Sequence, residues 1–273
     1  MKILFLGDIV GRSGRDAVCQ NMKRWRQELQ LDLVVANGEN AAHGFGLTRA
    51  IATELFQSGV DVVTLGNHAW DQSEMVSAIG AFPHLIRPLN YPPGTPGHGA
   101  VVVEVKPGCK ALVLNLMGRI FMDPLDDPFR AVAELLSKHR LGTTVQAIVV
   151  DIHAEATSEK MGLATLLDGH VSLVVGTHTH VPTADWRILP GGTAYQTDAG
   201  MCGAYDSIIG MDKTIALERF TNKVKRTRHQ PAPGPATVCG LYVEVDDRTG
   251  RATQVAPFRQ GGFLSQAWPA SNV

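Results

Sequence analysis

Apolar and polar positions follow two different periods along the chain. Short apolar runs bounded by turn residues are typical of buried strands, whereas apolar residues three or four apart predict one face of a helix. Val18, Met22, Trp25 and Leu29 have the second spacing and predict a helix after the first apolar run. The apolar runs predict strands at residues 3–6, 33–36, 60–65, 101–105, 111–117, 147–152 and 171–175.

Capping residues indicate where several helices begin and end. Thr48 is placed to cap a helix that Gly59 ends, and Asp127-Pro128 is a typical helix start. Two further helices are expected at residues 75–79 and 158–167.

After residue 182 the pattern changes to short strands with Gly- or Asp-rich turns, expected at residues 186–189, 193–197, 238–245 and 252–257. No internal repeat or low-complexity linker separates the two parts. We therefore expect one α/β domain over residues 1–273, in which the second half completes a second sheet and helices cover the outer faces.

The composition is that of an ordinary globular protein, with 44% apolar and 19% charged residues among 273. A chain of this length buries enough surface to fold without disulfides or a structural metal. Its 25 basic and 26 acidic residues give a net charge of -1. Because binding to a long nucleic acid needs a positive track, no such partner is expected.

The cysteines and the N-terminal residues indicate the compartment. Cys19, Cys109, Cys202 and Cys239 lie far apart and lack the spacing of a zinc or redox motif. The apolar run at residues 3–6 is too short for a signal peptide, and no stretch approaches ~18 apolar residues. We expect a cytoplasmic protein with reduced thiols and no membrane segment.

Five of the expected strands are followed at once by side chains that bind metals. Loops beyond the carboxyl ends of parallel strands gather along one edge of a sheet, so these side chains are expected in one crevice. The glycines beside them permit tight turns or close backbone approach. The strand ends carry Asp8, then Asn37, Glu39 and Asn40, then Asn67 and His68, then Asp151 and His153, and finally His178 and His180.

This donor set indicates the kind of metal. Imidazole and carboxylate without thiolate suit Fe, Mn, Zn or Co better than Mg or a structural zinc. There are more donors than one ion needs, and two ions ~3.5–4 Å apart would use them all. His178 and His180 are two residues apart, so in an extended segment both rings would point the same way. The histidines that follow no such strand are interpreted as structural: His43, His84, His98, His139, His170 and His229.

The order of these residues resembles the calcineurin-like metallophosphoesterase superfamily. Gly66-Asn67-His68, His153 and Thr177-His178-Thr179-His180 match its strand-end blocks. The first block, at Gly7-Asp8, lacks its usual His, and Glu39 replaces the usual bridging Asp of the second. These departures, with the stretch at residues 189–195, resemble the narrower bacterial YmdB-like family of 2′,3′-cyclic-nucleotide 2′-phosphodiesterases, over nearly the whole chain.

The resemblance implies a fold and a role for each ligand. The fold is a four-layer α/β sandwich of two mixed sheets flanked by helices. One metal is held by Asp8, Glu39, Asn40 and His180, and the second by Glu39, Asn67, His153 and His178. Glu39 bridges the two ions. Iron is the expected metal, with manganese or zinc as alternatives.

The implied reaction is hydrolysis of small 2′,3′-cyclic nucleotides to 3′-nucleotides. A metal-bound hydroxide attacks phosphorus, and His68, which is not a ligand, protonates the leaving oxygen. A histidine side chain has a reference pKa of ~6.5, which suits this role. Substrate contacts are open, with Arg119 and Asn90 (beside Tyr91) as candidates, and Asp198 is a candidate for orienting a ligand histidine.

Two other functions remain open at this stage. The same metals would serve a phosphomonoesterase or a nuclease acting on short RNA. Alternatively, the chain is a regulatory nucleotide-binding protein in which catalysis is secondary. A homo-oligomer is expected for an α/β enzyme of this size.

Overall fold

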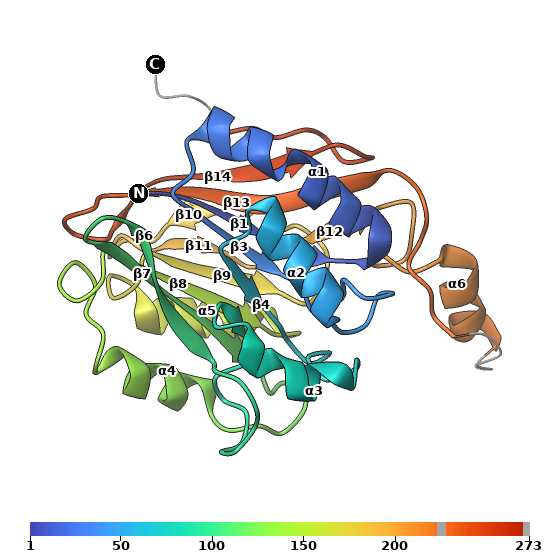
Figure 1. Cartoon of the computed structure of the whole chain (residues 1–273), viewed down its shortest axis with the longest axis horizontal. Coiled ribbons are helices and arrows are strands. Elements are labelled where there is room, and N and C mark those ends of the chain that lie inside the picture. Colours follow the sequence, from blue (N-terminus) through green and yellow to red (C-terminus); the bar gives the residue numbers. More distant parts are fainter. Residues whose placement is uncertain (223–227, 270–273) are drawn as a thin grey trace.

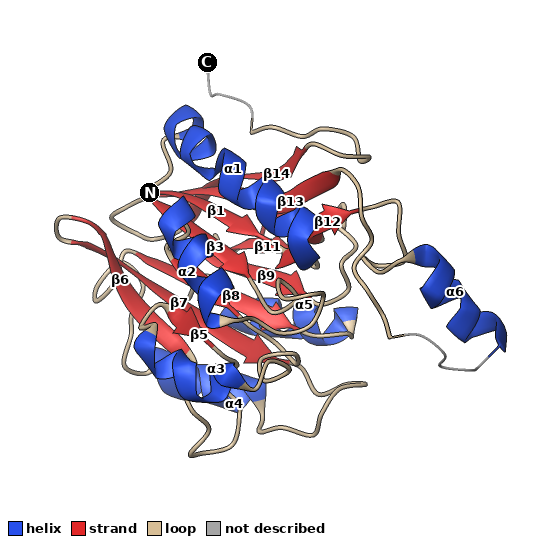
Figure 2. Ribbon diagram, turned by 45° about the vertical axis from the view of Figure 1, so that its right-hand side comes forward, coloured by secondary structure: helices blue, strands red, loops and turns tan. Residues whose placement is uncertain are grey.

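The computed structural model describes residues 1–222 and 228–269. Within these residues the strands form two mixed sheets that face each other, and helices cover their outer faces (Figures 1 and 2). This is the four-layer α/β arrangement expected from the sequence, which is therefore confirmed.

The first sheet is built around a parallel core. Strands β1, β3, β4 and β5 pair in parallel, whereas β13 pairs antiparallel with β1, β12 and β14. A short strand, β2, extends the sheet beside β12. The strands are β1 (Lys2–Leu6), β2 (Asp8–Ile9), β3 (Leu33–Asn37), β4 (Val62–Thr64), β5 (Leu85–Ile86), β12 (Met201–Ala204), β13 (Ala236–Val245) and β14 (Ala252–Gln260).

The second sheet also has a parallel core with antiparallel edges. β7, β8, β9 and β11 pair in parallel, and β6 and β10 close the two edges antiparallel. The pairing of β6 with β7 confirms the expected hairpin. The strands are β6 (Ala100–Lys106), β7 (Cys109–Met117), β8 (Ala147–His153), β9 (Leu173–Thr177), β10 (Arg187–Ile188) and β11 (Ala194–Gln196).

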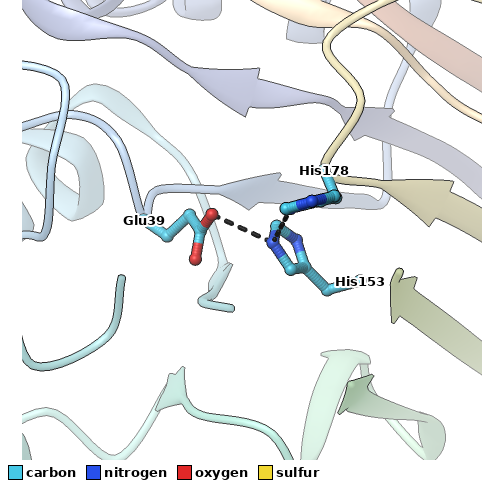
Figure 3. A group of neighbouring side chains, drawn as sticks. All are labelled: Glu39, His153 and His178. Carbon is cyan, nitrogen blue, oxygen red and sulfur yellow. Dashed lines mark hydrogen bonds and ion pairs between the residues drawn. The ribbon is translucent and has the colours of Figure 1, made fainter. Parts of the chain in front are cut away.

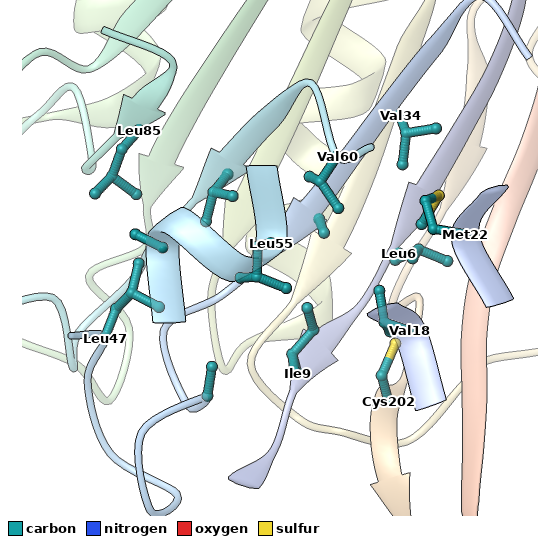
Figure 4. Packing of buried hydrophobic residues seen from close by; sticks show 14 of the residues in the cluster. Leu6, Ile9, Val18, Met22, Val34, Leu47, Leu55, Val60, Leu85 and Cys202 are labelled. Atoms are coloured by element: carbon teal, nitrogen blue, oxygen red, sulfur yellow. The ribbon is translucent and has the colours of Figure 1, made fainter. Parts of the chain in front are cut away.

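Three apolar cores separate the four layers. Phe5 and Val35 of the first sheet meet Val113 and Val149 of the second in the middle core. On the outer side of the first sheet, α1 and α2 pack over a core that contains Val18, shown in Figure 4. The third core lies under α4 and α5. The helices are α1 (Gly11–Leu29), α2 (Arg49–Ser58), α3 (Glu74–Ala78), η1 (Ile79–Ala81), α4 (Pro128–Leu136), α5 (Thr157–Leu167) and α6 (Lys213–Asn222).

The expected caps are present. The Thr48 hydroxyl accepts a hydrogen bond from the Ile51 N–H at 3.3 Å, and Gly59 ends α2 with a φ of 112°. At the start of α4, Asp127 accepts from the N–H groups of the first turn. These local signals are readable because each depends on residues within one helical turn.

The last part of the chain departs from the expectation. The strands β12, β13 and β14 join the first sheet, and they do not complete the second. The pairing that decides this joins Phe5 to Leu241 across the middle of the sheet. Helix α6 was not predicted, and it projects away from the two sheets (Figures 1 and 2).

Two further findings concern the expected thiols and membrane segments. The cysteines are all free, and three of them are buried. Among the described residues, no helix has the length and apolar character needed to cross a membrane.

Candidate metal centre and its cavity

The five strand ends meet at one edge of the two facing sheets. β1, β3 and β4 run parallel in the first sheet, and β8 and β9 run parallel in the second, so their carboxyl ends share a direction within each sheet. The side chains that follow these strands contact one another across the gap between the sheets. The predicted ligands thus lie in one place.

His153 lies at the centre of this cluster (Figure 3). Its Nε2 is 3.0 Å from Glu39 Oε1 and 3.1 Å from His178 Nδ1. The Asn67 Oδ1 lies 2.9 Å from the same nitrogen. Candidate ligand atoms of Glu39, His153 and His178 all fall within 4.8 Å of one another. This is the set assigned by the resemblance to the second metal.

Each histidine has one ring nitrogen occupied by an acceptor outside the cluster. His153 Nδ1 lies 2.9 Å from the Thr177 hydroxyl, and His180 Nδ1 lies 2.8 Å from the Ile209 carbonyl. His178 Nε2 lies 3.2 Å from a Glu155 carboxylate oxygen. These contacts orient the rings. They leave His153 Nε2 facing Glu39, His180 Nε2 facing Asp8 and His178 Nδ1 facing His153 Nε2. One nitrogen of each ring thus points into the cluster, as metal-binding histidines require.

Thr177 connects His153 to a buried carboxylate. Its hydroxyl donates to Asp151 at 2.6 Å and therefore accepts from His153 Nδ1. Thr64 also donates to Asp151, at 2.5 Å. Burial raises the pKa of Asp151 to about 6, against the opposing effects of His153 and the two hydroxyls.

We predict that Thr177→Val lowers metal affinity about 10- to 100-fold, because His153 loses the acceptor that orients it. Thr177→Ser keeps the hydroxyl and should behave as the unchanged protein. Metal titration of all three proteins measures the effect. Equal affinities for the Val and Ser variants would contradict the role of the hydroxyl.

The set predicted for the other metal includes Asp8. Its Oδ1 lies 3.8 Å from His180 Nε2 and 3.8 Å from His153 Nδ1. Within the part of the chain that is described, Asp8 Oδ1 and Asn40 Oδ1 are buried without a hydrogen-bond partner. Buried oxygen acceptors without donors are costly, and a bound cation satisfies them. The residues of this set therefore fit a metal.

The charges of the cluster also fit a cation. Burial alone would raise the pKa of Glu39, but His153 and the N–H and ring of His68 hold it at about 2. Burial would lower the pKa of His153, yet Glu39 and Asp8 raise it to about 9. Burial raises the pKa of Asp8. Buried carboxylates of this kind need positive charge beside them, which bound metal ions supply.

Two of the strand-end glycines lie against neighbouring groups so closely that a side chain would not fit. A Cβ at Gly66 would collide with the Glu39 carboxylate and the His153 ring, and a Cβ at Gly7 would collide with the Gly200 carbonyl. Any larger residue at position 66 would occupy space that the ligands use.

The expected extended segment at His178 and His180 is wrong. Both residues have a positive φ, of 98° and 66°. Histidine adopts this region more often than most residues, but the conformation costs about 1–3 kcal/mol. The strained turn aims the His178 ring at His153 and the His180 ring at Asp8.

Asp198 holds this turn through its backbone. It accepts from the Thr179 N–H at 3.1 Å and from the Thr179 hydroxyl at 2.8 Å. The buried Lys160 pairs with the same carboxylate at 2.8 Å. Among the described residues, the hydrogen bonds of the Asp198 carboxylate reach Thr179, Lys160 and Gly200 but no histidine ring. The expectation that Asp198 orients a ring is therefore corrected.

His68 contacts the predicted ligand Glu39 through its backbone. Its backbone N–H donates to Glu39 Oε2 at 2.9 Å. Its Nδ1 lies 2.8 Å from an Asp71 carboxylate oxygen, so the ring is held as a histidine–carboxylate pair. The ring is about a quarter exposed, with 28% of its side-chain surface accessible.

The candidates for substrate contact have partners within the protein. The Arg119 guanidinium pairs with Asp127 at 3.1 Å and lines a separate hollow. The Asn90 amide donates to two carbonyls and accepts from the Met117 N–H, so its polar atoms support the backbone. Tyr91 donates to the Gly66 carbonyl at 2.9 Å, which places it under the turn that carries the ligands.

A cavity of about 530 Å³ opens beside the cluster. Among the predicted site residues, Glu39, Asn40, His68, His178 and His180 line it. His229, interpreted as structural from the sequence, also lines it. Asp71, Glu155 and Thr177 were missed, since each is recognised only by its contact with a histidine.

Known proteins resemble this chain over most of its length. A sequence model of the family described as YmdB-like protein matches residues 4–258. The 2′,3′-cyclic-nucleotide 2′-phosphodiesterase of Bacillus subtilis is 47% identical over 255 residues, which is 93% of this chain and 95% of that protein.

Two solved structures have the same fold. A hypothetical protein from Thermus thermophilus has a TM-score of 0.89 and 45% identity, over 96% of this chain and 100% of that one. A phosphatase from Mycoplasma pneumoniae has a TM-score of 0.88 and 34% identity, over 96% of this chain and 93% of that one.

Proposed function

The chain belongs to the YmdB-like protein family, a family of phosphatase and phosphodiesterase enzymes, and from this premise we propose that it hydrolyses 2′,3′-cyclic mononucleotides to 3′-nucleotides with two metal ions. The observation that carries the proposal is a pair of buried oxygens, on Asp8 and Asn40 beside the His153 cluster, that have no hydrogen-bond partner among the described residues. The donors proposed for the two ions lie beside a cavity, and Glu39, Asn40, His178 and His180 line it.

The ligand assignment follows the family resemblance, and the contacts among Glu39, His153 and His178 support it. One ion would be held by Asp8, Glu39, Asn40 and His180, and the other by Glu39, Asn67, His153 and His178. Bound there, the ions would neutralise the anionic phosphate oxygens and make water more acidic. Iron, manganese and zinc all suit the imidazole and carboxylate donors, and we propose iron.

The reaction adds one water across one P–O bond. The water oxygen bonds to phosphorus, the bond from phosphorus to O2′ breaks, and O2′ leaves as a hydroxyl after accepting a proton. His68 lines the cavity and has Nδ1 held by Asp71, so Nε2 is the ring nitrogen available to give that proton. The phosphate stays on O3′.

The size of the cavity supports a small substrate. A volume of about 530 Å³ lies within the usual range for small-ligand sites, roughly 300–1,000 Å³. The net charge of -1 offers no positive track for a long nucleic acid.

The first experiment measures hydrolysis of 2′,3′-cyclic AMP by the purified protein supplied with Fe or Mn. We expect release of the 3′-phosphate product, and we expect a chelator to abolish it, because the proposed reaction depends on bound ions to neutralise the phosphate oxygens and to acidify water. Re-addition of the metal should restore the activity.

The substrate assignment would be refuted if a sample that holds two metals per chain leaves the cyclic nucleotide intact. Faster turnover of phosphate monoesters or of short RNA in the same sample would assign the site to the phosphomonoesterase or nuclease function instead. Release of the 2′-phosphate product would refute the assignment of the bond that is cleaved.

A further inference from the structure

The cavity beside the ligand cluster has two chemically different walls. One wall carries the polar site residues already described. The other is apolar and is formed by residues that the proposed reaction does not use. These residues are Phe45, Ile208, Ile209, Met211, Ala216 and Phe220.

Three separate segments build the apolar wall. Phe45 comes from the loop between β3 and α2, where Gly44 and Gly46 on either side have φ of 86° and 79°. Gln72 donates to the Phe45 carbonyl at 2.7 Å and fixes the loop. Phe220 lies near the end of α6, the helix that projects from the body (Figures 1 and 2).

Part of the apolar wall is exposed to solvent. Phe220 retains 75% of its accessible surface and Ile209 retains 54%. Large apolar side chains that line a hollow and remain exposed are typical of a surface that a ligand covers. Because the wall includes phenylalanine rings, a flat aromatic ligand would gain both burial and stacking there.

Ile209 ties the apolar wall to the metal centre. Its φ of 47° lies in the left-handed region, which is unusual for a β-branched residue. In this conformation its carbonyl accepts from His180 Nδ1 at 2.8 Å, while its side chain lines the cavity. One residue thus positions a predicted ligand and one side of the apolar wall together.

Phe45 connects the same wall to His68. Their rings meet edge to face with centroids 5.1 Å apart. A group that packs on the apolar wall would therefore lie next to a phosphate bound beside His68 and the ligand cluster.

We propose that the apolar wall is the nucleobase subsite, in which the base of the substrate stacks on Phe220 while its cyclic phosphate lies at the polar wall. The inference rests on the proposed function and adds the recognition of the base to it. Every base has an aromatic face, so stacking of this kind discriminates little between bases. It separates nucleotides from cyclic phosphodiesters that have no base.

The test compares two substrates with the same reacting group. 2′,3′-cyclic AMP carries a base, and glycerol 1,2-cyclic phosphate is a cyclic phosphodiester without one. We expect the unchanged protein to have a much larger kcat/KM for the nucleotide. In Phe220→Ala this preference should fall about five- to a hundredfold, the range found when a stacking ring is removed.

Matched variants show whether stacking is the cause. Phe220→Trp keeps an aromatic face and should keep the preference. Phe263→Ala removes an exposed phenylalanine away from the cavity, with 67% of its surface accessible, and should change nothing. Binding of 3′-AMP and of inorganic phosphate, measured by calorimetry in the same variants, provides a readout that needs no turnover.

The outcomes separate this inference from the proposed function. A metal-loaded protein that hydrolyses both substrates equally overturns the nucleobase subsite and leaves the function intact. Two other results would also overturn the subsite. In the first, Phe220→Ala retains the preference for the nucleotide. In the second, the variant loses the preference, but sedimentation shows that its oligomeric state has changed as well. If neither substrate is hydrolysed, the proposed function fails. Tighter binding of 3′-AMP than of phosphate, lost in Phe220→Ala, would then still support the subsite, and equal binding would overturn it.

Discussion

Replacing Glu39 by Gln is expected to remove both metal ions together and to lower hydrolysis by about 10³-fold or more, because the ions supply several kcal/mol of charge stabilisation. The Glu39 carboxylate is buried, with one oxygen 3.0 Å from His153 Nε2 and the other 2.9 Å from the His68 N–H. An amide has one weaker oxygen donor in place of two charged ones. Its NH₂ group would oppose either the His68 N–H or an incoming cation.

A comparison with Asp8→Asn makes the test specific for a bridge. Asp8 belongs to one predicted set, so its amide variant should retain one ion per chain, whereas the Glu39 variant should retain none. Glu54→Gln serves as a control because Glu54 is 45% exposed and pairs with Arg15 outside the cavity. Elemental analysis of folded protein measures all three. Equal metal content in the Glu39 and Asp8 variants would refute the bridge.

The sequence predicts the edge of the sheets where these residues lie because short-range signals decide it. Leu33–Asn37 and Ala147–His153 are buried throughout, as continuous apolar runs in parallel strands require. Since the ligands follow directly after such strands, their gathering depends only on the strands being parallel. Knowledge of the distant contacts was not needed.

Other parts of the site depend on contacts that spacing does not reveal. Thr177 and Asp151 hold His153 through side chains on neighbouring strands, 26 residues apart. Asp198 reaches Thr179 only because the strained turn brings the Thr179 N–H to it. Arg119 follows an apolar strand, a position that suggests a phosphate contact, yet its guanidinium pairs with Asp127. In each case a tertiary partner decides the role.

The same limit explains the departure in the fold. The run at Ala236–Val245 is readable as a strand, but nothing in it shows which sheet it joins. The choice rests on pairing with β1, about the whole length of the chain away. Helix α6 has a weak apolar pattern, with only Ala216 buried, so its sequence carries little of the helical period on which prediction depends.

Replacing His68 by Ala should lower turnover of 2′,3′-cyclic AMP by roughly 10²–10⁴-fold while the metal content stays unchanged. The ring of His68 is held by Asp71, His68 lines the cavity, and its backbone N–H donates to the predicted ligand Glu39. That N–H remains in the alanine variant, so Glu39 keeps its hydrogen bond. The control is His139→Ala, since His139 lines a different hollow. Full activity in a metal-loaded His68→Ala sample would refute the role.

The leaving group distinguishes proton donation from other effects of the ring. The ribose O2′ is a poor leaving group without a proton, whereas p-nitrophenolate leaves as a stable anion and needs little help from an acid. We therefore expect His68→Ala to lose far less activity on bis(p-nitrophenyl) phosphate than on the cyclic nucleotide. An equal loss on both substrates would show that the ring stabilises charge or positions the phosphate. In that case Asp71, which holds the ring, would serve placement and not proton transfer.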